Sequence, residues 1–175
     1  TTDRYGWHRD NTIGSTPQIN TVADNWLDFW RHRRLDYQLA LAVNRGAGSQ
    51  LGKKGQRLMD DLELLFSGYR PQASLLHGDL WSGNYGFTRT GRPTIFDPAV
   101  YYGDREADLA MTELFGGFSR DFYAAYENPW PLDAGFAVRK KLYNLYLVLN
   151  HFNMFVGGYL SQAQRMIDSL LSEIR

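Results

Sequence analysis

The feature that most limits the fold is a change of hydrophobic pattern in the middle of the chain. From Val22 to Phe66, and again after Asp104, apolar residues recur at three- and four-residue steps, as on the buried face of an α-helix. Between 71 and 103 the apolar runs are short and are separated by Gly, Pro and Ser, as in strands joined by turns. The pattern predicts a mainly α fold with a small β-hairpin between two helical parts.

The helical pattern divides into several predicted elements. We expect a first helix at 22–43, a break at 44–55 and a second helix that ends near Gly68. Further helices are expected at 105–115, 119–127, 136–156 and 160–174. Residues 1–20 are rich in Thr, Asn, Gly and Asp and are predicted to be loop. A chain of 175 residues, 43% of them hydrophobic, fits one domain with a buried core.

One group of polar residues has the spacing of a catalytic site. His77, Asp79 and Asn84 follow the spacing H-x-D-x-x-x-x-N, and Asp97 comes thirteen positions after Asn84. This is the arrangement of a kinase catalytic loop and its metal-binding aspartate. Phosphoryl transfer needs a carboxylate that orients the attacking hydroxyl and accepts its proton, and oxygen ligands that hold Mg²⁺ on the phosphates of ATP. Asp79 suits the first task, and Asn84 with Asp97 suits the second.

The predicted hairpin brings the two candidate metal ligands together. Its strands are expected at 84–88 and 93–97, joined by a short loop that contains a glycine. Asn84 opens the first strand and Asp97 closes the second, and these ends are neighbours in an antiparallel pair. The alternative is that Asp79, Asn84 and Asp97 are only turn residues, because Asp and Asn favour turns. The joint spacing favours the catalytic interpretation.

Other polar residues near this constellation have structural interpretations. We expect His77 to bond to nearby backbone. Asp104 and Asp108 stand at the start of a predicted helix, where an N-cap and first-turn acids are favoured by the helix dipole. The alternative is that these two, with Glu106, are further metal ligands. Trp81 lies between the candidate base and the candidate metal ligand, so we expect it to form a wall of the substrate site.

Two weaker patterns occur elsewhere in the sequence. The segment 47–54 nearly matches a phosphate-binding loop, but its first Gly and its final Ser/Thr are replaced, so a solvated basic loop is favoured. A polar and aromatic stripe on the predicted helix 136–156 could equally face a sugar or pack in the core. The stripe consists of Tyr143, Tyr146, Asn150 and Met154.

The composition excludes several classes of protein. Nineteen Lys and Arg balance nineteen Asp and Glu, so there is no basic field to attract nucleic acid or an anionic membrane. No cysteine is present, which rules out disulfides, thiolate catalysis and cysteine zinc sites. No apolar run is long enough to span a bilayer, and no signal peptide is visible. We expect a cytoplasmic protein without nucleic-acid or membrane partners, of undetermined oligomeric state.

Longer stretches around the constellation narrow the class. The segments LLHGDLWSGN and IFDPAVYYGDREADLAM, with NTIGSTPQIN near the start and LNHFNMF near the end, are similar to the fructosamine kinase (ketosamine-3-kinase) family in its bacterial form. H-G-D-x-x-x-x-N alone would indicate only the protein-kinase-like superfamily that includes aminoglycoside phosphotransferases. Trp81, together with Phe96-Asp97-Pro98-Ala99, makes the resemblance specific, and it runs over essentially the whole chain.

The resemblance implies a protein-kinase-like fold that is α+β when complete, with this chain as its C-terminal lobe. Residues 1–20 would be an interlobe segment, and 21–175 the helical lobe that carries the catalytic loop and hairpin at 74–98. The glycine-rich loop, strand lysine and helix glutamate of a kinase have no candidate in the sequence. We therefore expect that the N-terminal ATP-binding lobe is absent, and that the 175 residues alone are inactive.

The resemblance also implies an activity. It is the ATP- and Mg²⁺-dependent phosphorylation of the 3-hydroxyl of a ketosamine, a sugar on an amine such as a ribulosamine or fructosamine, free or protein-bound. Phosphorylation destabilises the adduct, so the role would be deglycation. By position, Asp79 is the base, Asn84 and Asp97 bind magnesium, and Trp81 contacts the sugar-amine. Roles for four further residues are left open: Gln18, Asn20, Asn150 and His151.

Three alternatives remain at this point. The first is another small-molecule phosphotransferase, acting on aminoglycosides, choline or homoserine with the same catalytic residues. The second is a non-catalytic, kinase-like lobe. The third is a metallophosphoesterase, which is suggested by the Gly-Asp pairs at 78–79 and 103–104 and the Gly-Asn pair at 83–84 of this sequence. That class needs several metal-ligating histidines, and the chain has four His in all, none of them next to Asn84.

Overall fold

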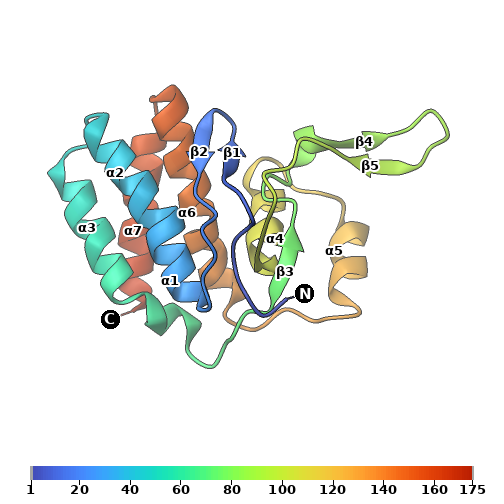
Figure 1. The fold of residues 1–175 in the computed structure, drawn as a ribbon, viewed down its shortest axis with the longest axis horizontal. Helices are drawn as coiled ribbons and strands as arrows, with labels where there is room; N and C mark the ends of the chain where they lie inside the picture. The colour runs from blue at the N-terminus through green and yellow to red at the C-terminus, as the bar shows by residue number, and fades with distance from the viewer. Residues whose placement is uncertain (1, 175) are drawn as a thin grey trace.

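The computed structural model describes residues 2–174, which form a helical body with three small antiparallel sheets (Figure 1). The helical elements are α1 (Trp26–Trp30), the π-helical η1 (Arg31–Leu35), α2 (Asp36–Asn44), α3 (Ser49–Asp60), the 3₁₀ turns η2 (Leu62–Phe66) and η3 (Ser82–Asn84), α4 (Arg105–Leu114), α5 (Arg120–Glu127), α6 (Phe136–Phe155) and α7 (Tyr159–Glu173). The strands are β1 (Asn11–Ile13), β2 (Thr16–Gln18), β3 (Ala73–Leu76), β4 (Tyr85–Phe87), β5 (Pro93–Ile95) and β6 (Tyr101–Asp104).

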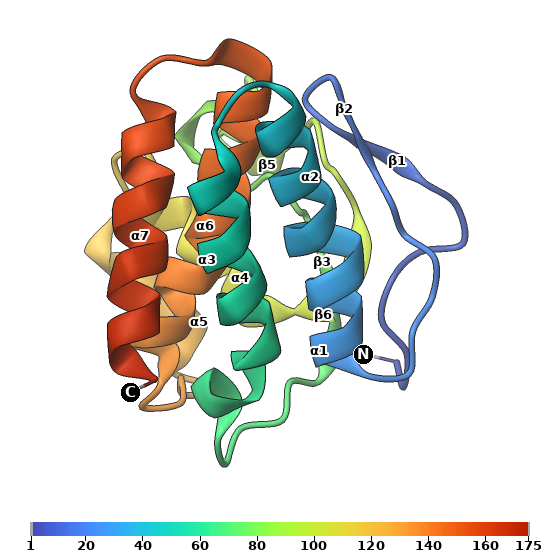
Figure 2. The same cartoon turned by 90° about the vertical axis from the view of Figure 1, so that its left-hand side faces the viewer.

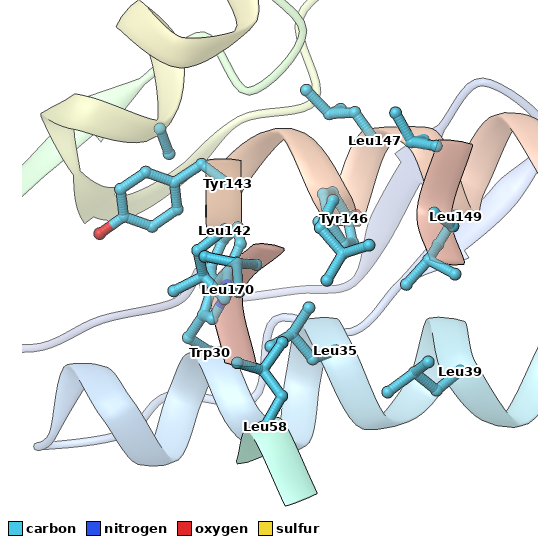
Figure 3. Close-up of a cluster of buried hydrophobic side chains, with 14 of the residues drawn as sticks. Trp30, Leu35, Leu39, Leu58, Leu142, Tyr143, Tyr146, Leu147, Leu149 and Leu170 are labelled. Atoms are coloured by element: carbon cyan, nitrogen blue, oxygen red, sulfur yellow. The ribbon is translucent and has the colours of Figure 1, made fainter. Parts of the chain in front are cut away.

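The hydrophobic core lies in a bundle around α6. This helix packs against α2, α4 and α7, and α3 packs against α2 and α7. Figure 2 shows α1, α2, α3 and α7 together on one face of the molecule. Figure 3 shows apolar side chains of the first helices facing those of α6, and all of those it labels are buried: Trp30, Leu35, Leu39, Leu58, Leu142, Tyr143, Tyr146, Leu147, Leu149 and Leu170. Burying each such side chain contributes about 1.5–3 kcal/mol to folding, so the bundle is a firm base for the loops that it carries.

Two strand pairs lie beside this bundle. In the first, β3 pairs with β6 so that Leu76 lies opposite Tyr101. The segment 77–100 therefore begins and ends next to this strand pair. In the second, β4 pairs with β5 in a hairpin that extends away from the body (Figure 1). The segment that carries the chemistry-bearing residues is therefore anchored by one strand pair and shaped by another.

The mainly α fold and most predicted elements are confirmed. The hairpin lies where it was predicted, and helices α4, α5, α6 and α7 begin and end within one residue of the predicted bounds. The first helix is shorter than predicted, because Asn25 caps it by accepting from the backbone N–H groups of Leu27 and Asp28. From Trp26 onward the helical path continues through η1 to Asn44.

Two predictions about loops are wrong. The break predicted at 44–55 is only a short turn, because α3 already begins at Ser49, so the basic residues at 53 and 54 lie on a helix. The loop predicted at 1–20 contains the hairpin β1–β2, with Ile13 opposite Thr16 and Gly14 at a φ of 58° in the turn. Within residues 2–174, no helix has the length and apolar character required to cross a membrane.

Candidate active site

Hydrogen bonds from the main chain and the ring of His77 hold the candidate catalytic loop in place. The carbonyl of His77 accepts from the N–H of Ala99 at 2.8 Å, which continues the β3–β6 pairing by one more bond. Its Nε2 lies 3.0 Å from the carbonyl oxygen of Phe96, and its Nδ1 accepts from the N–H of Asp79 at 3.3 Å. Because a carbonyl oxygen can only accept, Nε2 carries the proton. The ring thus links the catalytic loop to the chain after the hairpin.

A second anchor comes from the helix α4. The carboxylate of Asp108 accepts from the N–H of His77 at 2.7 Å and from the N–H of Gly78 at 2.8 Å. Gly78 has a φ of 80°, and a Cβ at this position would collide with the carbonyl of Ala99. The sequence therefore needs glycine here for two reasons, a left-handed backbone and a close approach between two chain segments.

Asp79 and Asn84 meet through side-chain hydrogen bonds. The amide Nδ2 of Asn84 donates to the main-chain carbonyl of Asp79 at 2.9 Å and to its carboxylate Oδ2 at 3.0 Å. Burial raises the pKa of Asp79 above its ordinary value, and the bond from Asn84 opposes that effect. Asn84 is itself buried, on the short turn η3 that leads into β4.

The hairpin places Asp97 next to Asn84. Tyr85 lies opposite Ile95 in the register, and the N–H of Phe96 donates to the carbonyl of Asn84 at 3.1 Å. Asp97 follows directly with a φ of 56°, a left-handed conformation that is uncommon for a residue other than glycine. Its side chain is exposed. The bond between Phe96 and Asn84 places Asp97 next to Asn84, and Asn84 is itself bonded to Asp79. Asp79, Asn84 and Asp97 are therefore brought together.

A cavity of about 430 Å³ opens beside Asp79 and Trp81. Trp81 is half-buried, and its indole meets the ring of Phe115 edge to face at a centroid distance of 6.0 Å. The remaining walls come from the β1–β2 turn, the end of α4, the second half of α6 and the start of α7. The lining residues are Ile13, Gly14, Asp79, Trp81, Met111, Phe115, Leu147, Asn150, His151, Met154, Phe155 and Tyr159.

The stripe on α6 divides between core and cavity. Tyr143 and Tyr146 are buried and donate to Asp104 and Gln18 respectively, so they belong to the core. Met154 lines the cavity together with Asn150, one turn before it. The change occurs because α6 runs from the middle of the bundle to its end beneath the β1–β2 turn (Figure 1).

Gln18 and Asn20 tie the segment before α1 to the rest of the site. Gln18 donates to the carbonyl of Ala99 at 3.0 Å and accepts from the hydroxyl of Tyr146 at 2.9 Å. Asn20 accepts from the guanidinium of Arg34 at 2.8 Å, and Arg34 lies over the rings of Phe29 and Tyr101. These buried bonds position the β1–β2 hairpin over the segment that follows Asp97. The spacing of residues in sequence gave no signal for them.

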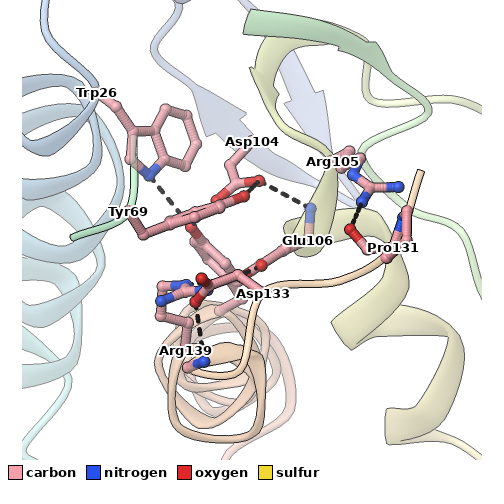
Figure 4. A network of polar contacts seen from close by, with 10 residues as sticks. Trp26, Tyr69, Asp104, Arg105, Glu106, Pro131, Asp133 and Arg139 are labelled. Atoms are coloured by element: carbon pink, nitrogen blue, oxygen red, sulfur yellow. Dashed lines mark hydrogen bonds and ion pairs between the residues drawn. The ribbon is translucent and has the colours of Figure 1, made fainter. Parts of the chain in front are cut away.

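Asp104 lies outside the cavity, in a buried polar network (Figure 4). Its carboxylate caps α4 through the N–H of Glu106 and accepts from the hydroxyls of Tyr69 and Tyr143. Burial, with the nearby Glu106, raises the pKa of Asp104 to about 6. Glu106 in turn forms a bidentate ion pair with Arg139, at 2.8 and 2.9 Å. Both acids therefore have structural partners, and neither lines the cavity.

Two oxygen-bearing side chains at the hairpin base are suited to Mg²⁺. Among residues 2–174, no group of three or more His, Cys, Asp and Glu side chains is arranged to hold a metal ion. Asn84 and Asp97 offer an amide and a carboxylate, which are the hard oxygen ligands that Mg²⁺ prefers. Protein sites often supply only one or two such ligands and leave the others to phosphate and water. Asn84 and Asp97 are therefore suited to hold a Mg²⁺ ion whose other ligands would be phosphate or water.

The helical body, the anchored loop and the hairpin define the C-terminal lobe of a protein-kinase-like fold. The model of the family described as fructosamine kinase matches residues 1–173. The chain belongs to the fructosamine kinase family.

Named relatives and solved structures agree with this assignment. The chain is 50% identical over 172 residues to a probable ketoamine kinase of Synechocystis, covering 96% of this chain and 56% of that protein. It is 44% identical over 175 residues to the chloroplastic protein-ribulosamine 3-kinase of Arabidopsis thaliana, covering 100% of this chain and 53% of that protein. The crystal structure of a candidate fructosamine-3-kinase from Thermobifida fusca superposes with a TM-score of 0.89 at 31% identity, covering 98% of this chain and 59% of the other. The chain thus spans little more than half the length of these relatives.

Proposed function

We propose that the whole protein phosphorylates the 3-hydroxyl of ketosamines, such as ribulosamine or fructosamine adducts, with ATP as the donor and Mg²⁺ as the required ion. The observation that carries the proposal is the position of Asp79. Its half-buried carboxylate lines the 430 Å³ cavity and is bonded to Asn84, which lies beside Asp97 at the hairpin base. The names of relatives, ketoamine kinase and protein-ribulosamine 3-kinase, support the same class of acceptor.

Each residue of the loop has a defined task in this proposal. Asp79 orients the attacking hydroxyl and accepts its proton, which a carboxylate at the cavity wall can do. Asn84 and Asp97 hold the magnesium ion, which when bound neutralises charge on the phosphates of ATP. Trp81 forms one face of the acceptor site, where an indole can pack against a sugar ring. His77 and Asp108 keep the loop in place through the backbone bonds described above.

The raised pKa of Asp79 fits the task of a base. A carboxylate that is partly withdrawn from water is a stronger base than a free aspartate, because burial disfavours its charged form. The bond from Asn84 fixes one carboxylate oxygen and leaves the other for a hydroxyl. The side chain is thus both oriented and available.

Several finer points belong to the same proposal. The acceptor is either free or protein-bound, and phosphorylation initiates deglycation. The 175 residues alone are inactive, since the chain spans only about half the length of its relatives. The plant relatives are named as chloroplastic, so the cytoplasmic location expected from the sequence remains a prediction.

The test is ADP release by the whole protein, with and without ribulose-lysine or fructose-lysine, beside the 175-residue chain. The proposal predicts acceptor-stimulated turnover in the whole protein and none in the shorter chain. An absence of stimulation by either acceptor would contradict it, and a panel of aminoglycosides, choline and homoserine would then identify another hydroxyl acceptor. Activity in the 175 residues alone would contradict the expected need for the remaining part.

A further inference from the structure

The β4–β5 hairpin, which carries the proposed magnesium ligands at its base, projects from the body of the molecule (Figure 1). Residues 85–98 are exposed except Gly86, which is half-buried. At the base, the N–H of Asn84 donates to the carbonyl of Trp81 at 2.9 Å, and the N–H of Phe96 donates to the carbonyl of Asn84 at 3.1 Å. These bonds lie close to one point, so the direction of the hairpin depends on a further contact with the body.

An aromatic contact next to Asn84 joins the hairpin to the body. The ring of Tyr85 lies 4.8 Å from that of Phe118 between centroids, with the planes tilted by 50°. Of the rings that meet Tyr85 in the described part of the chain, only that of Phe118 lies outside the hairpin, because the other belongs to Phe87 on the same strand. Tyr85 follows Asn84 directly and lies opposite Ile95 in the register. A contact at Tyr85 therefore restrains both strands where they approach the two proposed ligands.

Phe118 is itself fixed to helix α4 by a chain of hydrogen bonds. Its N–H donates to the hydroxyl of Tyr123 at 3.1 Å. That hydroxyl lies 3.0 Å from the hydroxyl oxygen of Thr112, which is buried and donates to the carbonyl of Leu109 at 2.6 Å. Because the proton of Thr112 points to Leu109, Tyr123 is the donor between the two hydroxyls. The ring of Phe118 also meets that of Phe122 at 4.7 Å, so its position is set by α4 and α5 rather than by the hairpin.

The same helix holds both halves of the proposed active site. Asp108 of α4 accepts from the N–H groups of His77 and Gly78, at the start of the catalytic loop. One helical turn later, Thr112 begins the chain of bonds that leads to Phe118 and the hairpin. The proposed base and the proposed ion ligands are therefore both positioned relative to one rigid element.

Two glycines separate the contact at Phe118 from the acceptor cavity. Phe115 lines the cavity, whereas Phe118 lies against the hairpin. Between them, Gly116 and Gly117 have φ angles of 103° and 75°, and a Cβ on Gly116 would meet open space. Backbone of this kind is readily accessible to glycine. A change at Phe118 therefore alters the support of the hairpin without moving the wall of the cavity.

We propose that Phe118 is a positioning residue for the magnesium site. It holds the ring of Tyr85, and with it the hairpin base at which Asn84 and Asp97 meet. The inference rests on the proposed function, which assigns the ion to these two side chains. Because Phe118 does not line the acceptor cavity, its effect falls on the binding of Mg²⁺ with ATP rather than on the use of the acceptor.

The first measurement is ATP binding by the whole protein, titrated with and without Mg²⁺ in the absence of any acceptor. Phe118→Ala and Tyr85→Ala should each weaken Mg²⁺-dependent ATP binding by about threefold to tenfold, the contribution of one aromatic contact. The double variant should bind as weakly as either single variant, because both substitutions remove the same contact. Tyr85→Phe keeps the ring and should bind within about twofold of the unaltered protein. Thr94→Ala is the control, since Thr94 is exposed on the other strand of the hairpin.

Hydrogen exchange without nucleotide reports the state of the hairpin itself. Phe118→Ala should speed the exchange of the amides of Asn84 and Phe96, whose bonds close the hairpin base. The amides that pair β3 with β6 should exchange as in the unaltered protein, because that pair lies on the other side of the catalytic loop. With ribulose-lysine, the KM for the acceptor should stay within about twofold in Phe118→Ala and Tyr85→Ala.

The outcomes separate this inference from the proposed function. Unchanged Mg²⁺-dependent binding in Phe118→Ala, or losses that add in the double variant, would overturn the inference and leave the kinase assignment standing. An acceptor KM that rises as much as the dissociation constant for ATP would also overturn it, because the whole site would then be disturbed. If Phe118→Ala does not fold, the comparison of Tyr85→Ala with Tyr85→Phe on the exposed hairpin still decides the question.

Two further results bear on the proposed function. ATP binding by the unaltered protein that is indifferent to Mg²⁺ would overturn the roles of Asn84 and Asp97, and the inference with them. Absence of turnover with ribulose-lysine would count against the proposed acceptor alone, because ATP binding and hydrogen exchange are measured without it.

Discussion

The side-chain amide of Asn84 donates to two oxygens of Asp79, its main-chain carbonyl and its carboxylate, at 2.9 and 3.0 Å. This pair of bonds joins the base of the β4–β5 hairpin to the loop that leaves β3. One proposed magnesium ligand therefore orients the proposed base. A substitution at Asn84 should therefore disturb both the proposed ion site and the orientation of Asp79.

Asp97→Ala tests the other proposed magnesium ligand. In the whole protein the variant should lose Mg²⁺-dependent nucleotide binding, while its free energy of unfolding falls by no more than about 1–2 kcal/mol, because the side chain is exposed and the main cost is alanine at a left-handed φ of 56°. Titration of ATP in the presence and absence of Mg²⁺ measures the effect. Asp168→Ala is the control, since Asp168 is an exposed acid that forms only a surface ion pair with Lys54. Unchanged binding in Asp97→Ala would contradict the assigned role.

Gly78→Ala tests the close approach beneath the catalytic loop. Gly78 and Gly91 have similar positive φ angles, 80° and 77°, but only Gly78 faces a backbone carbonyl, and a Cβ on Gly91 would meet open space. Gly91→Ala should therefore cost about 1–2 kcal/mol, the ordinary cost of a left-handed residue. Gly78→Ala should cost clearly more and should reduce turnover as well. Equal losses in a urea unfolding series would show that the contact with Ala99 is not tight.

The local part of the site could be predicted from the sequence, and the long-range part could not. Asn84 and Asp97 are joined by a short hairpin, and strand pairing over so few residues follows from turn residues and alternation alone. The bond between Tyr146 and Gln18 spans 128 residues, and it depends on how α6 packs beneath the β1–β2 hairpin. No periodicity within either segment contains that information.

Neither the short strands near the N-terminus nor the burial of Arg34 could be predicted from the sequence. The strands β1 and β2 have three residues each, which is too short for an alternating pattern to show. Arg34 stands in a run of basic residues that resembles a solvated surface, yet it is fully buried because Asn20 and the carbonyl of Ile19 accept its N–H groups. Such burial becomes visible only when the partners are in place.

Asp104→Asn tests the buried carboxyl group at the start of α4. Its pKa rises from the ordinary 3.8 to about 6 in the folded protein, first because of burial and then because of Glu106. The contribution of this group to stability is therefore present below about pH 4 and is lost as the pH rises through about 6. The difference in unfolding free energy between the unaltered protein and Asp104→Asn should decrease across this window, by at most about 1.4 kcal/mol per pH unit. A difference that stays constant from pH 4 to 7 would refute the raised pKa.

Arg139→Met tests the buried ion pair with Glu106 that Figure 4 shows. The side chains are 2% and 1% exposed, so removal of the guanidinium leaves a carboxylate without its partner. We expect a loss of about 3–5 kcal/mol in the free energy of unfolding. The double variant Arg139→Met, Glu106→Gln should recover part of that loss, because Glu106 then no longer leaves a buried charge without its partner. A single variant that loses less than about 1 kcal/mol would show that the pair is open to water.

The measurement that tests the central claim most directly is acceptor-stimulated ADP release by the Asp79→Asn variant of the whole protein. Asparagine keeps the size of the side chain and an oxygen that can accept from Asn84, but it cannot take a proton from the hydroxyl. With ribulose-lysine as acceptor, kcat should fall by roughly 10²–10⁴-fold while the affinity for ATP stays within about twofold, and Asp168→Asn should match the unaltered protein. Turnover retained within about tenfold would contradict the assignment of Asp79 as the base.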